Sequence, residues 1–529
     1  TVSANPAAHT VVAGVQDLIF ANYQFDATQS GEDVKFSSIP LDYNFLTALS
    51  GNQLTSCFLY DGLTNLNSSS VVNPAAATVT GANLTFTLNN PLTIAKGTVK
   101  TLALKCNVTT GAVAANWFSW GIDVSTGSLM TVTGSSGSDV VETATASVGQ
   151  RMTVGTATLA ISTATSPSYA LAAAGQAGIT IGNINFRATN DAITLQDVGL
   201  TLTNTASSSP NDLTQVSIWD GTTKVGTATF TGANTTATST LSALVTLPQN
   251  VDKILTVKAD FTTIGSGPTD TGTQGHLLSV DANASTKGVG SSSGTIWATG
   301  STAFSGVRIF KSYPTFAGVA LPSTSLVSGT VADLYRFSVT AHAAGPIGIY
   351  KFTVNIATSS TPGGTSTTTV TDLKIMAYTD SGFSSAVNGF SPEGQLNDTI
   401  AGLLSSGNTD VLLTASTQGT NKDYLQIPAG TTYYFKVIGT ITMTGSPTGA
   451  QVVTNIQGDS VYPTTNVYVS NGGTGFMASS TGIDTDAEDD FIWSPNATTT
   501  SVTTVTDWTN GYFVSGLPSS NMDSKTLTK

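Results

Sequence analysis

A motif that recurs at a nearly constant interval limits what this chain can fold into more than any other feature. It reads Leu-Thr-Gln-Val-Ser-Ile-Trp-Asp-Gly at 213–221, with a close copy at 54–62 and a looser one at 373–382. Its aspartates stand at 61, 220 and 380, so the intervals are 220 − 61 = 159 and 380 − 220 = 160 residues. Such an interval is typical of a repeated domain and too long for a solenoid. We predict domains at 1–152, 153–306 and 307–529, the third with an insertion around 381–423 and a C-terminal extension.

The segments around the motif alternate apolar and polar residues with a period of two, as half-buried antiparallel strands do. Within the motif Val216 and Ile218 share one face, and the Asp-Gly pair after them predicts a hairpin turn. We therefore predict an all-β fold of tandem immunoglobulin-like β-sandwiches, one per repeat. A single parallel β-helix is the alternative, but it should repeat about every 20–25 residues.

Composition excludes several classes of function. Only 10% of residues are charged, and the net charge is −13 at pH 7 with a pI near 4.4. Nucleic-acid binding needs a basic surface, so we expect no nucleic-acid partner. No run of about 18 apolar residues occurs, so we expect no transmembrane segment. An acidic, hydroxyl-rich, lysine-poor surface is common on secreted proteins, and we expect an extracellular, cell-surface location after removal of a signal or pro-segment.

Cys57 and Cys106 are the two cysteines of the chain. Each lies in the apolar phase of its strand, Cys57 with Leu59 and Cys106 with Leu104, so we predict that both point into one core. In an extracellular protein we expect a disulfide that crosses the sandwich, worth about 4 kcal/mol through loop closure. Two buried thiols acting as small hydrophobic groups are the alternative.

Two groups of residues near the C-terminus are candidate binding sites. Alternating carboxylates of the kind that Ca²⁺ selects occur at Asp484, Asp486, Glu488 and Asp490. Aromatic side chains that could stack on sugars occur at Trp493, Trp508 and Tyr512. The alternatives are a solvated acidic loop and a plug at the end of a core. Asn-X-Ser/Thr sequons at 83, 107, 234 and 496 are candidate glycosylation sites.

The first repeat is asymmetric at its start. A strand leads into the second and third repeats ahead of Pro167 and Pro314, and we interpret 511–514 as the matching strand that closes the third repeat. In the first repeat the corresponding Pro6 has only five residues before it. That repeat therefore lacks its upstream strand or receives it from elsewhere, and an unpaired sheet edge templates strand addition from another chain. We predict that the first residues lie in a contact between subunits: Thr1, Val2, Ser3, Ala4, Asn5 and Pro6.

The C-terminal region carries a family resemblance. Asp490-Phe-Ile-Trp-Ser-Pro-Asn-Ala-Thr-Thr-Thr, Asp507-Trp-Thr-Asn-Gly-Tyr and Leu334-Tyr-Arg-Phe-Ser-Val-Thr-Ala resemble large surface proteins of uncultured, small-genome bacteria. The similarity covers mainly 326–529 and, more loosely, all three repeats. It implies a secreted immunoglobulin-like repeat protein of the cell envelope, of the surface-layer or filament type. It implies no particular functional residue.

Our leading hypothesis is a structural subunit that polymerises with itself into an extracellular layer or filament. The three similar modules, the few charges that would oppose close packing, and the incomplete first repeat motivate it. A surface adhesin that binds glycans or another cell is the alternative. We expect no enzymatic activity, because no catalytic constellation can be found in the sequence, and no cofactor other than the candidate calcium.

Overall fold

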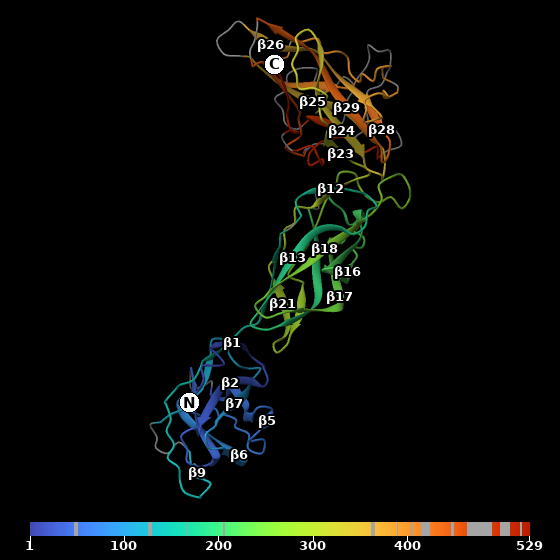
Figure 1. The fold of residues 1–529 in the computed structure, drawn as a ribbon. Helices are drawn as coiled ribbons and strands as arrows, with labels where there is room; N and C mark the ends of the chain where they lie inside the picture. The colour runs from blue at the N-terminus through green and yellow to red at the C-terminus, as the bar shows by residue number, and fades with distance from the viewer. Residues whose placement is uncertain are drawn as a thin grey trace.

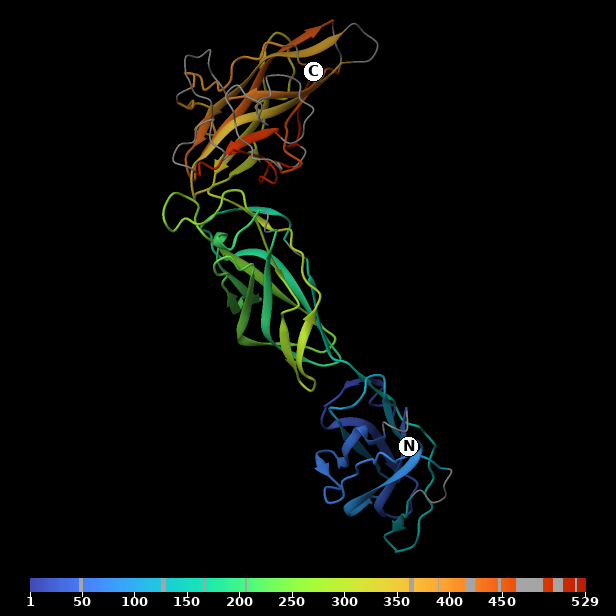
Figure 2. The ribbon, with the colours of Figure 1, turned by 180° about the vertical axis from the view of Figure 1, so that it is seen from behind.

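The computed structural model describes residues 1–529 except 47–50, 125–129, 166, 205–206, 361–365, 389, 403, 405, 414–423, 446–448, 463–488, 498–507 and 519–520. Three lobes follow one another along an elongated molecule, with the two termini in the lobes at opposite ends (Figures 1 and 2). Strands dominate, and the helical elements among the described residues are two short 3₁₀ turns, Gly51–Gln53 and Pro210–Asp212. The prediction of an all-β protein built from β-sandwiches is confirmed. In the described part of the chain no helix is long and apolar enough to span a membrane.

The first lobe packs two sheets around one core. The smaller sheet has the order β2 (Leu18–Asp26), β7 (Val99–Val108), β4 (Leu54–Asp61) and β5 (Thr64–Asn65). The larger has the order β1 (His9–Val12), β10 (Met152–Gly155), β8 (Trp117–Gly121), β3 (Val34–Phe45) and β6 (Ala82–Ile94), with β9 (Thr133–Gly134) beside β3. Strand β10 pairs with β1 and β8, so the first lobe extends to residue 155.

In the middle lobe the strands form one continuous sheet that closes on itself, because β20 pairs with both β21 and β14. Its order is β12 (Ala170–Ala173), β22 (Val307–Phe310), β19 (Leu277–Ala282), β14 (Ile193–Thr203), β17 (Thr236–Leu247), β16 (Thr223–Ala228), β15 (Leu213–Asp220), β18 (Asp252–Phe261), β13 (Ile179–Thr189), β11 (Thr158–Thr163), β21 (Gly294–Thr299) and β20 (Lys287–Gly290). Strand β22 pairs inside this lobe, so the division from the third lobe falls after 310 and not at 307.

The third lobe is again a two-sheet sandwich. One sheet has the order β23 (Pro314–Gly318), β24 (Val331–Ala341), β29 (Thr432–Thr444) and β26 (Thr367–Tyr378). The other has the order β32 (Thr509–Asn510), β31 (Phe491–Ser494), β25 (Ile347–Ser359), β30 (Gln451–Ile456) and β33 (Lys525–Thr528), with β27 (Ser406–Leu412) and β28 (Leu425–Ile427) beside β25.

The closing strand of the third lobe is β33, so the interpretation of 511–514 as that strand is wrong. In the first two lobes the closing strands β10 and β22 pair in parallel with β1 and β12 near the start of the lobe. Thr528 of β33 makes the same parallel contact with Ser325. Residues 511–514 instead form a turn, in which Phe513 has a positive φ of 59°. A proline soon after an apolar run marks a turn as readily as the end of a strand.

The recurring motif forms β4 and β15, each followed by a tight turn at a glycine with positive φ, 60° at Gly62 and 59° at Gly221. A left-handed backbone is the conformation that glycine adopts without steric cost. A lysine from the neighbouring strand lies over the aromatic ring before the turn, with Lys105 Nζ 4.5 Å from the centroid of Tyr60 and Lys258 Nζ 4.1 Å from that of Trp219. The motif therefore combines a core strand, a turn and a cation–π contact.

Candidate functional site

In the middle and third lobes the first strand completes the core. Strand β11 pairs antiparallel with β13, and β23 pairs antiparallel with β24. The inward side chains of β11 are Leu159 and Ile161, which are 0% and 4% exposed, and Phe316 of β23 is 4% exposed. Each of these strands therefore covers apolar residues that would otherwise face solvent.

A β-bulge makes the three lobes comparable residue by residue. The strands compared are β2, β13 and β24, and β13 and β24 are the ones that pair with the first strand of their lobes. Each has a register shift: between Ile19 and Ala21 in β2, between Thr180 and Gly182 in β13, and between Asp333 and Tyr335 in β24. Counting from the bulge, one set of equivalent positions is Tyr23, Ile184 and Phe337. The next inward set is Phe25, Phe186 and Val339. In the two later lobes these positions lie opposite the first strand.

In the first lobe the described chain fills only the C-terminal end of that strand position. The Thr1 ammonium donates to the Gln24 carbonyl at 2.9 Å, and the Gln24 N–H donates to the Thr1 carbonyl at 2.8 Å. The Ser3 N–H donates to the Asn22 carbonyl at 2.8 Å. By the bulge register Thr1 occupies the position of Ser162 in β11. Among the described residues, none takes the positions of Ile161 and Leu159 opposite Phe25 and Ala27.

The segment 142–145 forms the second wall of this empty position. Val34 of β3 pairs with Gly134 as Ile193 of β14 pairs with Gly290, so 138–143 corresponds to β21. In the middle lobe β11 lies between two neighbours, antiparallel to β13 and parallel to β21. In the first lobe both neighbours are present, and none of the described residues forms the strand between them. We call the space bounded by Tyr23–Ala27 and 142–145 the strand slot.

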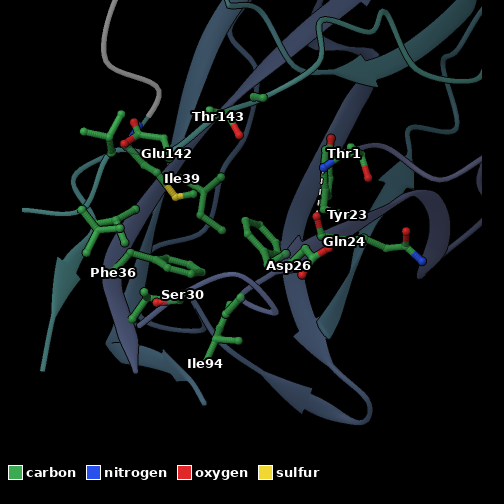
Figure 3. Close-up of a pocket in the computed structure, with 18 of the residues that line it drawn as sticks. Thr1, Tyr23, Gln24, Asp26, Ser30, Phe36, Ile39, Ile94, Glu142 and Thr143 are labelled. Carbon is green, nitrogen blue, oxygen red and sulfur yellow. Dashed lines mark hydrogen bonds between the residues drawn. The ribbon is translucent and has the colours of Figure 1, made fainter. Parts of the chain in front are cut away.

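The strand slot is a groove of about 1170 Å³. Pockets for small molecules are usually about 300–1,000 Å³, so the slot is larger than one such ligand requires. Figure 3 shows Thr1, Tyr23 and Asp26 along one side and Glu142 and Thr143 along the other. Its apolar lining includes Phe36, Ile39, Leu41, Ile94 and Val132. A groove with these apolar residues and a polar rim, lying between β2 and the segment 142–145, fits an extended chain with alternating side chains.

Incomplete burial marks the slot as an open part of the core. Phe25 is half-buried, whereas its equivalents Phe186 and Val339 are fully buried. Val34 is likewise half-buried, and its equivalent Ile193 is buried. In the middle lobe Leu159 and Ile161 supply that cover, and no described residue takes their place in the first lobe.

The polar groups at the slot are backbone groups of β2 and two carboxylates at its rim. Backbone groups alternate in direction along a strand, so Asp26 presents its N–H and carbonyl to the same side as Asn22 and Gln24, toward the empty position. Hydrogen bonds from the Thr28 hydroxyl and N–H lower the pKa of the Asp26 carboxyl. Those from Ser136 and Ser135 lower the pKa of the Glu32 carboxyl. Both carboxylates therefore stay ionised at the rim, beside the backbone N–H and carbonyl of Asp26.

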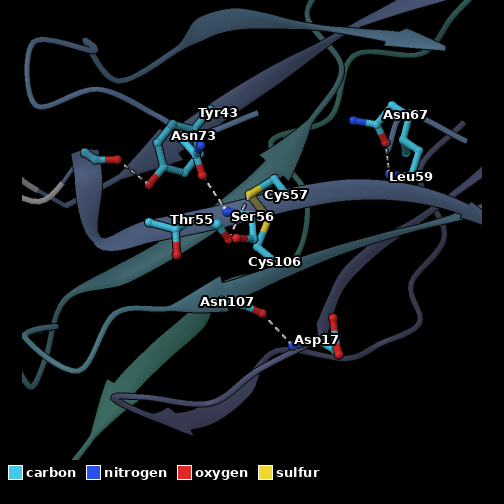
Figure 4. The surroundings of a disulfide bond; sticks show 11 residues. Asp17, Tyr43, Thr55, Ser56, Cys57, Leu59, Asn67, Asn73, Cys106 and Asn107 are labelled. Carbon is cyan, nitrogen blue, oxygen red and sulfur yellow. Dashed lines mark hydrogen bonds between the residues drawn. A yellow bond between two sulfur atoms is a disulfide. The ribbon is translucent and has the colours of Figure 1, made fainter. Parts of the chain in front are cut away.

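The predicted cysteine pair is bonded, but within one sheet. Cys57 in β4 and Cys106 in β7 lie on hydrogen-bonded neighbouring strands, with Cα atoms 4.1 Å apart (Figure 4). Both side chains are buried in the core of the first lobe, as predicted. The expectation that the bond crosses the sandwich is wrong, because a period of two identifies the face of a strand and not its neighbour in the sheet.

The aromatic residues proposed as a sugar platform are largely core residues. Trp493 and Trp508 are 0% and 2% exposed, so neither presents a ring face to solvent. Trp493 Nε1 donates to the Asn510 carbonyl, and Trp508 packs edge-on against Tyr350 and Tyr424. Only Tyr512 is partly exposed, and it packs against Tyr169 of the middle lobe. The plug interpretation accounts for the two tryptophans.

The candidate calcium ligands fall mostly outside the described residues. Asp484, Asp486 and Glu488 belong to the segment 463–488, and Asp490 is the member that the structure describes. The Asp490 side chain is buried, and within the described residues no group of three or more His, Cys, Asp or Glu side chains is arranged to hold a metal ion. Of the four sequons, the one at Asn496 is buried as well.

The predicted assembly residues lie along β2 of their own chain. Thr1, Val2 and Ser3 pair with this strand, and the Asn22 side chain donates to the Asn5 carbonyl at 2.9 Å. The sequence indicated the missing strand but not the second wall at 142–145. That wall has no strand pattern of its own, and only the pairing of β9 with β3 relates it to β21.

Comparisons with known proteins add only distant similarities. No family model matches the chain, and no curated protein matches it. Among solved structures, a putative membrane-anchored protein from Corynebacterium diphtheriae aligns with 98% of this chain and 93% of its own, at 12% identity and a TM-score of 0.18. The major pilin subunit of Bacillus cereus aligns over 84% of this chain and 94% of its own, at 8% identity and a TM-score of 0.18. The C-terminal domain of a Streptococcus pyogenes antigen I/II-family protein covers 57% of this chain and 94% of its own, at 6% identity and a TM-score of 0.14. All three are bacterial surface proteins, and at these TM-scores no functional argument rests on them.

Proposed function

We propose that this chain is a structural subunit of an extracellular polymeric assembly, a surface layer or filament, whose copies are joined by strand insertion. One observation carries the proposal: no described residue of the first lobe pairs in the strand slot beyond Thr1, whereas β11 and β23 occupy the same position in the other two lobes. We assign the chain no catalytic role.

Strand addition would supply both backbone hydrogen bonds and apolar cover at the slot. An inserted strand pairs with the backbone groups that Asp26 directs toward the slot, and its alternate side chains cover Phe25 and Val34. This is the β-augmentation mode of recognition, in which main-chain hydrogen bonds give affinity and side-chain pockets give specificity. The low charge of the chain, 10% of residues, limits repulsion between copies. We infer that the inserted strand comes from a second copy of this protein.

Filling the slot from within the same chain tests the proposal. In the middle-lobe register Ile161 directly precedes the residue equivalent to Thr1, so the four residues Thr-Leu-Ala-Ile of 158–161 are added immediately before Thr1. The extended protein should remain monomeric in sedimentation velocity at concentrations where the unmodified chain assembles. Electron microscopy should show layers or filaments only for the unmodified chain.

A matched control carries Thr-Asp-Ala-Asp at the same place. It has the same length but cannot bury carboxylates in the slot, so it should assemble like the unmodified chain. Equal assembly of the Thr-Leu-Ala-Ile protein and the unmodified chain would rule out the slot as the joint. An unmodified chain that stays monomeric at millimolar concentration would rule out self-assembly.

A further inference from the structure

A lysine is buried among carboxylates on the outer face of β25. Lys351 Nζ lies 3.0 Å from Asp410 Oδ2 and 3.0 Å from Asp489 Oδ2, and these three side chains are 1%, 0% and 3% exposed. Removing an ion from water costs several kcal/mol even after the protein relaxes. In each of the other ion pairs of the described residues at least one side chain is partly exposed, as at His276–Asp212 with 24% and 0%, whereas all three members of this group are buried.

The burial is particular to the third lobe. By strand register Lys351 corresponds to Asp197 of β14, which forms an ion pair with Lys287 at 3.0 Å. Those two side chains are 16% and 31% exposed, so water reaches them. Asp410 likewise corresponds to Thr238 of β17, which is exposed. The same position of the fold thus holds a hydrated ion pair in one lobe and a dry one in the other.

Strand register aligns the amine with one carboxyl group. Thr353 is paired with Asp410 across β25 and β27, and Lys351 lies two residues away on the same face. The Thr353 hydroxyl donates to Asp410 Oδ1 at 2.7 Å, which leaves Oδ2 toward the lysine. The nitrogen is thereby held beside the Asp410 carboxyl group, and Asp489 Oδ2 is equally close and available as a base.

We propose that Lys351 and Asp410 condense to an intramolecular isopeptide bond. The neutral amine attacks Cγ of the protonated Asp410 carboxyl, a bond forms between Nζ and Cγ, and the bond from Cγ to the hydroxyl oxygen breaks. Asp489 accepts the proton that Nζ loses and returns it to the leaving hydroxyl, so the products are one amide and one water molecule. No oxidant, metal or other reactant is required.

The starting state is an ion pair, so a proton must first move to a carboxylate. Burial works to lower the pKa of Lys351, but the Asp410 and Asp489 carboxylates together raise it. Burial also raises the pKa of the adjacent Asp490 to about 7, so a protonated carboxyl is present in the cluster near neutral pH. Asp459, whose pKa burial raises well above its usual value, faces the same cluster.

Two physical effects favour the amide once the lobe has folded. Well-oriented intramolecular partners reach effective molarities of about 10⁵–10⁸ M, which offsets the usual preference for hydrolysis in water. Condensation also replaces two buried charges by a neutral amide and removes their desolvation cost. Exclusion of water from the cluster then protects the bond against the reverse reaction.

Intact mass spectrometry of the reduced and denatured full-length protein tests the inference directly. We expect the unmodified chain to be lighter than its sequence mass by one water, and tandem spectra to place the cross-link between the peptides that contain Lys351 and Asp410. A mass equal to the sequence mass would overturn the proposal. A cross-link to Asp489 would overturn the assigned partner.

Single variants test the roles of Lys351 and Asp489, and the measured mass does not depend on whether the protein polymerises. Lys351→Arg keeps the positive charge but should show the full sequence mass, and Asp489→Ala should show it too if that carboxylate relays the proton. The matched control Lys287→Arg, at the hydrated pair of the middle lobe, should still lose one water. If Lys351→Arg also loses one water, the modification lies elsewhere and the assignment fails.

Discussion

The disulfide of the first lobe permits a clean measurement of a cross-link's contribution to stability. Cys57 and Cys106 correspond to Val216 and Ala259 of the middle lobe, which pair directly with each other in the same two-strand arrangement. The double variant Cys57→Val/Cys106→Ala therefore substitutes side chains that this fold already accommodates, and it removes the covalent bond without leaving a large cavity. The closed loop has a sequence separation of 49 residues. Loop-closure entropy then predicts a loss of about 4 kcal/mol.

Differential scanning calorimetry measures the effect with an internal reference. For a lobe of this size, about 4 kcal/mol lowers the unfolding midpoint by about 8–16 °C. We expect one calorimetric transition to shift by that amount and the others to stay in place, because the middle and third lobes contain no cysteine. A shift below about 3 °C would refute the reasoning, since it would mean that the bond constrains the unfolded chain very little. Equal shifts of all transitions would show that the lobes do not unfold independently.

Three further predictions concern single side chains. Lys258→Met should destabilise the middle lobe by about 0.5–1 kcal/mol in urea titrations, because it removes the cation above Trp219, whereas Lys258→Arg should not. Trp508→Ala should cost about 3–5 kcal/mol in the third lobe while leaving any glycan-array signal unchanged, because this ring is buried. A glycan signal lost at unchanged stability would contradict that assignment. Burial raises the pKa of Asp490 to about 7, above the usual range of an aspartate, so the folded state binds the proton more tightly and stability should fall as pH rises from about 4 to 7. Asp490→Asn should flatten this decline in the unfolding midpoint of the third lobe, and an unchanged pH profile would contradict it.

Much of the architecture could be predicted because it depends on local patterns. The Asp-Gly turn and the alternating residues of 213–221 identify β15 and its hairpin, and the interval between copies counts the lobes. Long-range pairing has no comparable signal. Nothing in the alternation around Cys57 and Cys106 states that β4 and β7 are neighbours, and the turn at 511–514 has the composition of a strand. The middle lobe's closed sheet likewise depends on β20 reaching β14, a contact that local sequence does not encode.

The candidate site could be predicted only in part. Only five residues precede Pro6, and this count alone predicted that residues 1–529 hold no full counterpart of the strand that leads into the second repeat. The walls of the slot required coordinates, because residues 142–145 have no regular pattern and Phe25 resembles any core phenylalanine. The buried cluster at Lys351 was not visible in sequence either. Its partners, Asp410 and Asp489, are separated from it by 59 and 138 residues, and a lone lysine in a strand usually faces solvent.

The first strand of each lobe also decides how the molecule responds to a pull on its ends. In the middle lobe a force enters through β11, whose six residue pairs with β13 run along the pulling direction and are loaded together in shear. Within residues 1–529 the corresponding pairing of the first lobe is that of Thr1–Ser3, which three backbone hydrogen bonds hold to β2. A protein of residues 1–529 that is pulled at Thr1 in a single-molecule stretching experiment should therefore yield first in that lobe. The protein with Thr-Leu-Ala-Ile added before Thr1 lengthens this sheared interface toward that of β11, so its first lobe should yield at a higher force.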